Sequence, residues 1–234
     1  FKRIDPPIFE ARGIFERGIG EHTDIVEKEL FVVAGPHAGQ EESQKKAKEF
    51  ALRPEFTAGI CRAYIEHGMQ QLPQPVELYS IGQCFRYDRP QKGRYRQFHQ
   101  FDLEVIGLRD ASIDAQLIYV VTKILSDLKI LDRLSLQLNN IGTAENRAAY
   151  KDALKDFFIG KERQLPEEDQ RRLQTNPFRL LDSKFEDTQI LVKQAPKLSQ
   201  FLSDERKGFH SHLCEDLDAL GVTYTHNESL VRGL

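Results

Sequence analysis

The sequence predicts an α+β fold in which an antiparallel β-sheet is flanked by helices and carries a helical insertion. Three observations lead to this fold class. Residues 78–87 and 98–106 alternate in side-chain character, as two strands joined by a basic loop would. Residues 112–130 repeat apolar side chains at helical spacing. Residues 142–208 form a run of charged helical segments that differs in texture from the rest of the chain.

Composition bounds the class of protein. The 234 residues can hold one large domain, or one domain with an insertion, and 40% hydrophobic with 29% charged residues is ordinary for a soluble protein. A net charge of −3 gives no global attraction to nucleic acid, so RNA contacts would need local patches. No apolar run reaches about 18 residues, which predicts no membrane span. The chain begins at Phe1, so we expect the natural N-terminus to be missing.

The two predicted strands present one apolar face and one face of small and polar side chains. The apolar face should lie under helices, which leaves the other as a shallow floor with room for a small polar ligand. The apolar set is Tyr79, Ile81, Phe85, Tyr87, His99, Phe101, Leu103 and Val105. The floor set is Ser80, Gly82, Cys84, Arg86, Gln100, Asp102 and Glu104.

The loop between the strands is basic and contains Pro90 and Gly93, which favour a turn. Such loops are most often solvated rims. Here the cations border fixed carboxylates, a combination that suits a zwitterionic substrate with a polyphosphate better than plain nucleic acid, whose phosphates the acids would repel. The cations are Arg89, Lys92, Arg94 and Arg96.

The segments before the strands are expected to form the edge of the sheet and a helix. Residues 1–10 predict an extended segment stopped by Pro6 and Pro7, and residues 29–33 and 50–53 predict short strands. Residues 34–48 are polar and predict a surface loop. Thr57 is expected to cap the helix that follows. Taken alone, Glu55 on the strand-to-helix turn is an exposed loop acid.

The segments after the strands predict scaffold. Residues 134–139 alternate as a strand, residues 209–220 as a helix and residues 222–226 as a strand. His210 and His212 are two residues apart and therefore point to different sides of the helix, which makes them poor ligands for one metal. Three cysteines, Cys61, Cys84 and Cys214, are too few and too scattered for a metal site or a disulfide framework. We expect no metal ligands in the chain.

The contiguous run from Phe85 to Gln100, FRYDRPQKGRYRQFHQ, resembles motif 2 of class II aminoacyl-tRNA synthetases, and specifically of the histidyl-tRNA synthetase family. The resemblance extends over nearly the whole chain. It implies the class II synthetase fold, with Pro7 at the end of motif 1, a region that builds a homodimer interface. Because the chain stops at Leu234, we expect a fragment that lacks motif 3 and the anticodon-binding domain and is inactive alone.

The resemblance also implies binding residues for L-histidine. The LRPE-x-T segment would present Glu55 and Thr57 to the amino group, with Gln100 as the third acceptor, which suits an ammonium with three donors. Glu104 would accept a hydrogen bond from the imidazole and so separate histidine from apolar analogues. Phe56, in the same segment, stands where bacterial members commonly have glycine.

For the nucleotide, the resemblance implies two catalytic arginines, Arg86 and Arg232, which reach the α-phosphate from opposite sides and also belong to the histidine site. Arg94 would hold the outer phosphates of ATP together with Mg²⁺. Phe98 would stack on adenine, and Asp88 would lie near its amino edge, where most bacterial relatives have Glu.

The resemblance assigns residues 1–142 to the catalytic core, 143–208 to a helical insertion that touches the tRNA acceptor stem, and 209–234 to a return to the core. The insertion has nearly as many acids as bases, so a solvated subdomain that only packs stays an alternative. The implied function is cytoplasmic histidine–tRNA ligase, with tRNA(His) as partner. Two alternatives remain: the non-catalytic, synthetase-like regulatory subunit of ATP phosphoribosyltransferase, and an RNA-binding hairpin without chemistry.

Overall fold

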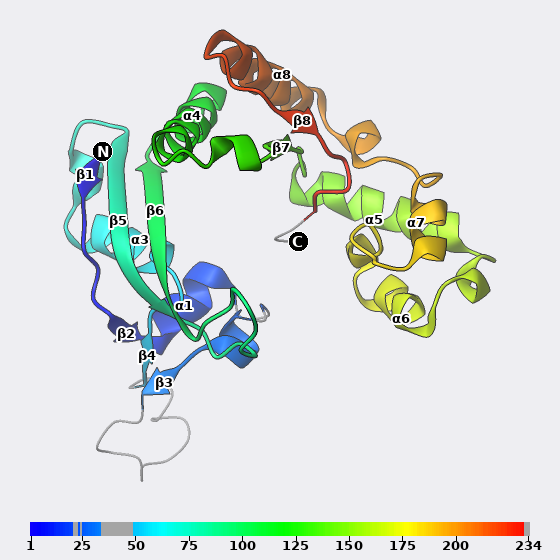
Figure 1. The fold of residues 1–234 in the computed structure, drawn as a ribbon, viewed down its shortest axis with the longest axis horizontal. Helices are drawn as coiled ribbons and strands as arrows, with labels where there is room; N and C mark the ends of the chain where they lie inside the picture. The colour runs from blue at the N-terminus through cyan, green and yellow to red at the C-terminus, as the bar shows by residue number, and fades with distance from the viewer. Residues whose placement is uncertain (21–22, 24, 34–48, 232–234) are drawn as a thin grey trace. The chain divides into compact units, whose positions relative to one another are not determined.

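A computed structural model describes residues 1–20, 23, 25–33 and 49–231 of the chain. These residues form two compact units, Phe1–Arg109 and Asp110–Leu234. The predicted α+β class, with its mainly antiparallel strand pairing, is confirmed (Figure 1). In the described part of the chain, every helix is too short or too polar to cross a bilayer. The predictions for residues 34–48 and for Arg232 lie outside the described residues.

The first unit is built on a long antiparallel pair of strands. β5 (Val76–Phe85) and β6 (Gln97–Ile106) pair along their whole length, from Val76 opposite Ile106 to Phe85 opposite Gln97. β1 (Lys2–Arg3) extends this sheet in parallel beside β5. A second small sheet has the order β2–β4–β3, with bounds Phe9–Ala11, Phe50–Leu52 and Val32–Val33.

Helices complete the first unit. α1 (Arg12–Ile19) packs against α3 (Thr57–Glu66). Shorter turns of helix are η1 (Ile25–Glu29) and η2 (Met69–Gln71). The main core joins α3 to the β5–β6 pair through Phe56, Ile60, Val76, Leu78 and Cys84.

The prediction about which face of the sheet is buried is wrong. The expected apolar face is open at its centre, where Ile81 is 53% and Phe101 42% exposed. α3 instead covers the face of small side chains, on which Ser80 and Cys84 are fully buried. The physical reason is that small residues on β5 let a helix approach closely, and the helix brings its own apolar side chains, Phe56 and Ile60, to the contact.

The second unit begins with α4 (Ala111–Asp127), close to the helix that the sequence predicts. Its first turn is capped by Asp110, whose side chain accepts a hydrogen bond from the Ser112 N–H at 2.9 Å. α4 packs against α8 (Asp204–Ala219), and β7 (Gln137–Leu138) pairs in parallel with β8 (Thr225–His226). The strand predicted over residues 134–139 is therefore shorter, because β8 offers only two residues to pair with.

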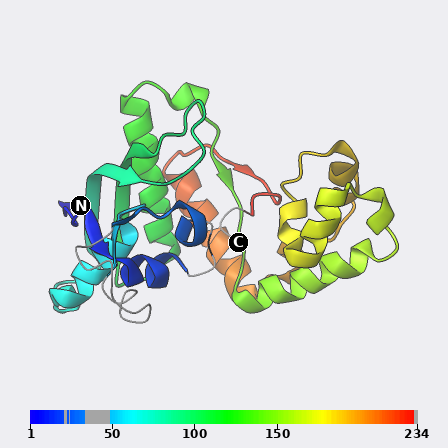
Figure 2. The same ribbon diagram turned by 90° about the horizontal axis from the view of Figure 1, so that it is seen from below.

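A group of helices lies between β7 and α8 in the sequence and packs around two hydrophobic clusters, one of which also includes Val231. α5 begins at a capping box formed by Thr143 and Asn146. Figures 1 and 2 show α5, α6 and α7 gathered together. The bounds are α5 (Ala144–Phe158), α6 (Glu167–Thr175) and α7 (Glu186–Val192), with short turns η4 (Glu162–Gln164), η5 (Pro177–Leu180) and η6 (Leu198–Phe201). Another short turn, η3 (Leu131–Arg133), lies before β7.

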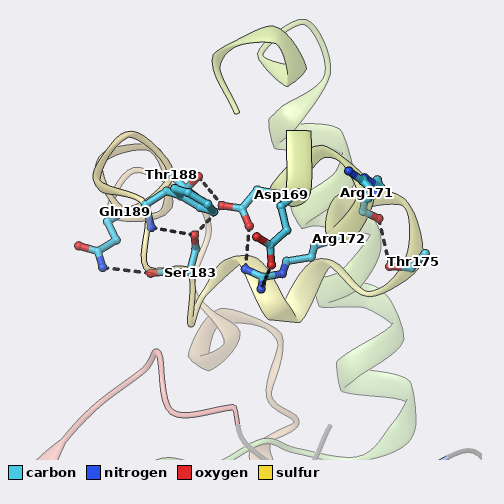
Figure 3. A network of polar contacts seen from close by, with 9 residues as sticks. Asp169, Arg171, Arg172, Thr175, Ser183, Thr188 and Gln189 are labelled. Atoms are coloured by element: carbon cyan, nitrogen blue, oxygen red, sulfur yellow. Dashed lines mark hydrogen bonds and ion pairs between the residues drawn. The ribbon is translucent and has the colours of Figure 1, made fainter. Parts of the chain in front are cut away.

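One buried carboxylate ties this group together (Figure 3). Asp169 of α6 is fully buried and accepts hydrogen bonds from Ser183, from Thr188 of α7 at 2.6 Å and from Arg172 at 2.9 Å. A buried charge is stable only when it is paired and hydrogen-bonded, and these three donors meet that need. Asp169 therefore fixes α7 and the turn before it against α6.

We predict that Asp169→Ala lowers the free energy of unfolding by about 3 kcal/mol, because it leaves a guanidinium and two hydroxyls without their shared acceptor. Chemical denaturation measures this. The matched control is Glu167→Ala on the same helix, where the side chain is 86% exposed and pairs with Arg171 at the surface. That variant should stay within about 0.5 kcal/mol of the parent. Equal losses in the two variants would contradict the structural role of Asp169.

Candidate functional site

The candidate site lies where β4 turns into α3, beside the polar half of β6. β4 ends at Leu52, and Pro54 stops further pairing. The carboxylate of Glu55 then accepts a hydrogen bond from the Ala58 N–H at 3.1 Å, in the first turn of α3. The cap expected from Thr57 is therefore provided by Glu55, and Thr57 is the first helical residue. This leaves the Thr57 hydroxyl available for a contact with β6.

Phe56 does not need the conformational freedom of glycine. Its backbone has φ −102° and ψ −30°, which is ordinary for a residue with a side chain. The Phe56 ring is 1% exposed, and the guanidinium of Arg53 lies 4.4 Å from its centre. The side chain thus belongs to the core, and Phe56 can offer a ligand only its backbone.

Gly82 belongs to the covered part of the predicted floor. A Cβ at this position would lie 2.9 Å from Nη2 of Arg53 and 3.4 Å from Cζ of Phe56, so the absence of a side chain makes room for Arg53. Arg53 is 8% exposed and donates to the backbone oxygens of Gln83 at 2.8 Å and Pro6 at 2.6 Å. Sequence reasoning did not single out Arg53, because its partners are distant in sequence.

Three carboxylates lie near one another on the β6 side of the site. The Glu104 carboxylate accepts a hydrogen bond from Thr57, and Oδ1 of Asp102 accepts one from Nε2 of Gln100 at 3.3 Å. Burial raises the pKa of both Asp102 and Glu104, and the charge of Glu55 raises both further. The structure therefore brings together the predicted residues Glu55, Thr57, Gln100 and Glu104.

Asp102 belongs to the predicted floor of the sheet, but the family resemblance gives it no role. Its Oδ2 atom is buried and has no hydrogen-bond partner among the described residues. The strand alternation that placed Asp102 on one face with Gln100 and Glu104 was the signal available for it. Cys61 of α3 lies near the same group: burial, and then the charges of these carboxylates, raise the pKa of its thiol.

Arg86 lies at the cationic side of the site. Its Nε donates to the backbone oxygen of Pro54 at 3.0 Å, and its guanidinium lies 5.2 Å from the ring centre of Phe98. Cys84 is close enough to both kinds of charge to respond to them: burial raises the pKa of its thiol to about 11, Arg53 and Arg86 lower it, and Glu55 and Asp102 raise it. The site therefore combines two arginines with carboxylates around one buried thiol.

The basic loop folds back on itself as a hairpin. Gln91 bridges to Arg94 across a turn in which Gly93 has φ +83°, a value that favours glycine. Asp88 pairs with Arg94 at 3.2 Å and also accepts the Arg89 N–H at 2.7 Å. The Arg94 side chain is 62% exposed, so it can leave Asp88 for an incoming anion at little cost.

The chemistry that this arrangement permits follows from its charges. A group of half-buried carboxylates with a hydroxyl and an amide oxygen can bind an ammonium or an imidazolium. A guanidinium that a backbone carbonyl already holds in place can bind a carboxylate or phosphate with little further loss of side-chain entropy. A small zwitterion next to a phosphate would meet both requirements.

Comparisons with known proteins agree with this picture. Residues 40–192 match the family model of the tRNA synthetase class II core domain (G, H, P, S and T). The structure of apo S. aureus histidyl-tRNA synthetase is similar at 33% identity, with a TM-score of 0.67, over 100% of this chain and 50% of that one. This chain thus spans about half the length of that relative.

A second similar structure shares the fold. It is an ATP phosphoribosyltransferase regulatory subunit/histidyl-tRNA synthetase from Bacillus halodurans, at 19% identity and a TM-score of 0.60, over 99% of this chain and 60% of that one.

The buried, unpaired Oδ2 of Asp102 leads to a prediction about pH. A carboxyl group with a raised pKa in the folded state binds its proton more tightly there than in the unfolded chain. The stability of the fold therefore falls as the pH rises from the ordinary value of 3.8 through the raised one. Asp102→Asn should raise the free energy of unfolding at neutral pH by about 1 kcal/mol, and the gain should vanish below pH 3.8.

Thermal unfolding over a pH series measures this. Asp5→Asn is the control, because the Asp5 side chain is 62% exposed in its pair with Arg3 and its removal should change stability by less than about 0.5 kcal/mol. A lower melting temperature for Asp102→Asn at neutral pH would contradict the prediction.

Proposed function

Since this chain belongs to the class II core-domain family of tRNA synthetases (G, H, P, S and T), we propose that the protein containing it is a histidine–tRNA ligase. It activates L-histidine with ATP to histidyl-adenylate and transfers the histidyl group to tRNA(His). The observation that carries this proposal is that the turn from β4 to α3 holds Arg86 at Pro54 and sets Glu55 and Thr57 near the carboxylates of β6. The 33% identity to a histidyl-tRNA synthetase along the whole chain supports it.

The amino acid end of the proposed substrate matches the acidic side. Glu55, Thr57 and Gln100 accept hydrogen bonds from the three donors of the ammonium group. Glu104 accepts a hydrogen bond from the imidazole. An apolar analogue of histidine would leave this half-buried carboxylate without its partner, which gives selectivity against such analogues.

The phosphate end matches the cationic side. In the first step a carboxylate oxygen of histidine forms a bond to the α-phosphorus of ATP, the bond from that phosphorus to the bridging oxygen breaks, and pyrophosphate leaves. Arg86 stabilises the charge on the phosphoryl oxygens from one side, and Arg232 from the other. In the second step the terminal ribose hydroxyl of tRNA attacks the carbonyl carbon, and AMP leaves.

The loop and Phe98 hold the rest of ATP in this proposal. Phe98 stacks on adenine, Asp88 accepts from its amino group, and Arg94 binds the outer phosphates. Mg²⁺ accompanies these phosphates, which supply its oxygen ligands. Asp88 keeps the Arg89 N–H as a partner, and its Oδ2 becomes available to the adenine amino group when Arg94 turns to the phosphates.

The proposed domain organisation assigns residues 1–142 and 209–234 to the catalytic core and residues 143–208 to an insertion directed at the tRNA acceptor stem. One cluster supports it: Ala111, Ala115 and Leu138 pack with Leu213, Leu217 and Val222, so the sequence before the proposed insertion packs against the sequence after it. A homodimer and a cytoplasmic location complete the proposal.

The second candidate is a regulatory subunit of ATP phosphoribosyltransferase, because a protein named for both activities shares the fold. Such a subunit can bind histidine but has no need of arginines on the α-phosphate. Arg86, held by Pro54 and facing Phe98, therefore favours the ligase.

We predict that Arg86→Ala lowers the rate of histidine-dependent ATP–pyrophosphate exchange by roughly 10²–10³-fold, as expected when one donor to the developing charge is removed. The assay uses the protein that contains this chain. Arg17→Ala is the control, because Arg17 is exposed and donates to Gly13 of its own helix. Histidine binding without any exchange in the parent protein would favour the regulatory subunit.

Histidine binding itself tests the acidic side. Glu104→Gln should weaken histidine binding by roughly 10-fold or more, because a neutral amide is a poorer acceptor for the imidazole than a carboxylate. Isothermal titration calorimetry measures the affinity. Glu66→Gln, in the exposed pair with Arg62 on the far end of α3, should leave it unchanged. Unaltered affinity in Glu104→Gln would remove Glu104 from the proposed site.

A further inference from the structure

A group of three metal-binding side chains lies in the second unit, separate in composition from the proposed ligase site. His210 and Cys214 belong to α8, and His226 belongs to β8. One ligand atom from each residue lies within 4.8 Å of the other two. No role in histidine activation requires these residues.

The spacing along α8 explains half of the arrangement. His210 and Cys214 are one helical turn apart, so their side chains lie on the same side of the helix. The distance from Sγ of Cys214 to Nε2 of His210 is 3.9 Å. His212, two residues from His210, lies on another side and is not part of the group.

The pairing of β7 with β8 explains the other half. The backbone of His226 is fixed between two hydrogen bonds, from Thr225 N to Leu136 O and from Asn227 N to Leu138 O, both at 2.9 Å. This register brings Nδ1 of His226 to 3.4 Å from Nε2 of His210. The third side chain thus comes from a strand that the sequence does not connect with the helix.

These distances suit a tetrahedral metal ion better than direct hydrogen bonds. A zinc ion with bonds of about 2.0–2.1 Å to nitrogen and 2.3 Å to sulfur holds its ligands roughly 3.3–3.6 Å apart. The observed separations of 3.4 Å and 3.9 Å are close to that range. Both are long for a hydrogen bond made by an imidazole.

A neighbouring network supports the sulfur ligand. The Tyr224 hydroxyl is near enough to the Cys214 thiol and to the Asp218 carboxylate to hydrogen-bond with either. Groups that hydrogen-bond a ligand in this way orient it and increase its affinity for the metal. Asp218 is one turn beyond Cys214 on α8, so the network follows the same side of the helix.

We propose that His210, Cys214 and His226 form a binding site for a divalent transition metal ion of the zinc class. Two imidazoles and a thiolate favour such an ion over Mg²⁺ or Ca²⁺, which prefer oxygen ligands. Three protein ligands leave a fourth position for water. The bound ion links α8 to β8, and so fixes the strand that leads into residues 227–231. The sequence predicts no metal ligands because its local spacing does not link His226 to His210 and Cys214.

Titration of the metal-free 234-residue chain with Co²⁺ tests the proposal, since Co²⁺ occupies zinc sites and reports its ligands by absorption. We expect one Co²⁺ per chain and a thiolate-to-cobalt charge-transfer band. Cys214→Ser should abolish the band. His210→Ala and His226→Gln should each weaken Co²⁺ binding by at least ~10–100-fold. Changes to groups that only hydrogen-bond a metal ligand already cause losses of that size.

Two controls and a second readout make the outcome decisive. His212→Ala and Cys61→Ser should bind Co²⁺ with the parent affinity and spectrum. Zn²⁺ should raise the melting temperature of the parent chain but not of His226→Gln, whose changed side chain is exposed, and Mg²⁺ should affect neither. The absence of a charge-transfer band, a band that Cys61→Ser removes, or equal Zn²⁺ stabilisation of His226→Gln would overturn the proposal.

Discussion

The pairing of β5 with β6 is the interaction on which the first unit depends. Its register sets Gly82 opposite Gln100 and Ser80 opposite Asp102, so the small residues of one strand lie beside the polar residues of the other. Because α3 packs over the small residues, its first turn is held next to the polar ones. A shift of the pairing register by one residue would turn Asp102 and Glu104 to the opposite face and so remove them from the site.

Backbone oxygens, rather than the carboxylates of the site, hold its arginines in place. Arg53 and Arg86 are held by carbonyl oxygens of Pro6, Gln83 and Pro54, so neither needs one of the nearby carboxylates as a partner. Among the residues that the structure describes, no ion pair neutralises Asp102 or Glu104, and burial raises the pKa of both. An arrangement that costs stability in the absence of a ligand is typical of a binding site, because a bound cation removes the cost.

The second unit also contains a buried carboxylate, but this one stabilises the fold. Asp169 is a buried carboxylate whose partners all come from its own unit, and it fixes helices rather than a ligand. The His210, Cys214 and His226 group, in contrast, has contacts too long to satisfy its members fully. Satisfied polar groups hold a structure together, whereas incompletely satisfied ones indicate where something else binds.

The sequence by itself determined the class of fold, the helix expected at residues 112–130 and found at 111–127, the β5–β6 pair and the family, because these follow from periodicity and from a contiguous motif. Tertiary structure decided which sheet face is buried, since Phe56 and Ile60 pack onto the face of β5 that carries its small residues.

Tertiary structure also decided the capping role of Glu55, the burial of Arg53 and the meeting of His226 with His210. Each of these depends on a contact between residues distant in sequence or on a turn geometry. The local sequence pattern does not predict such contacts, because its periodicity shows only which side of its own helix or strand a residue occupies.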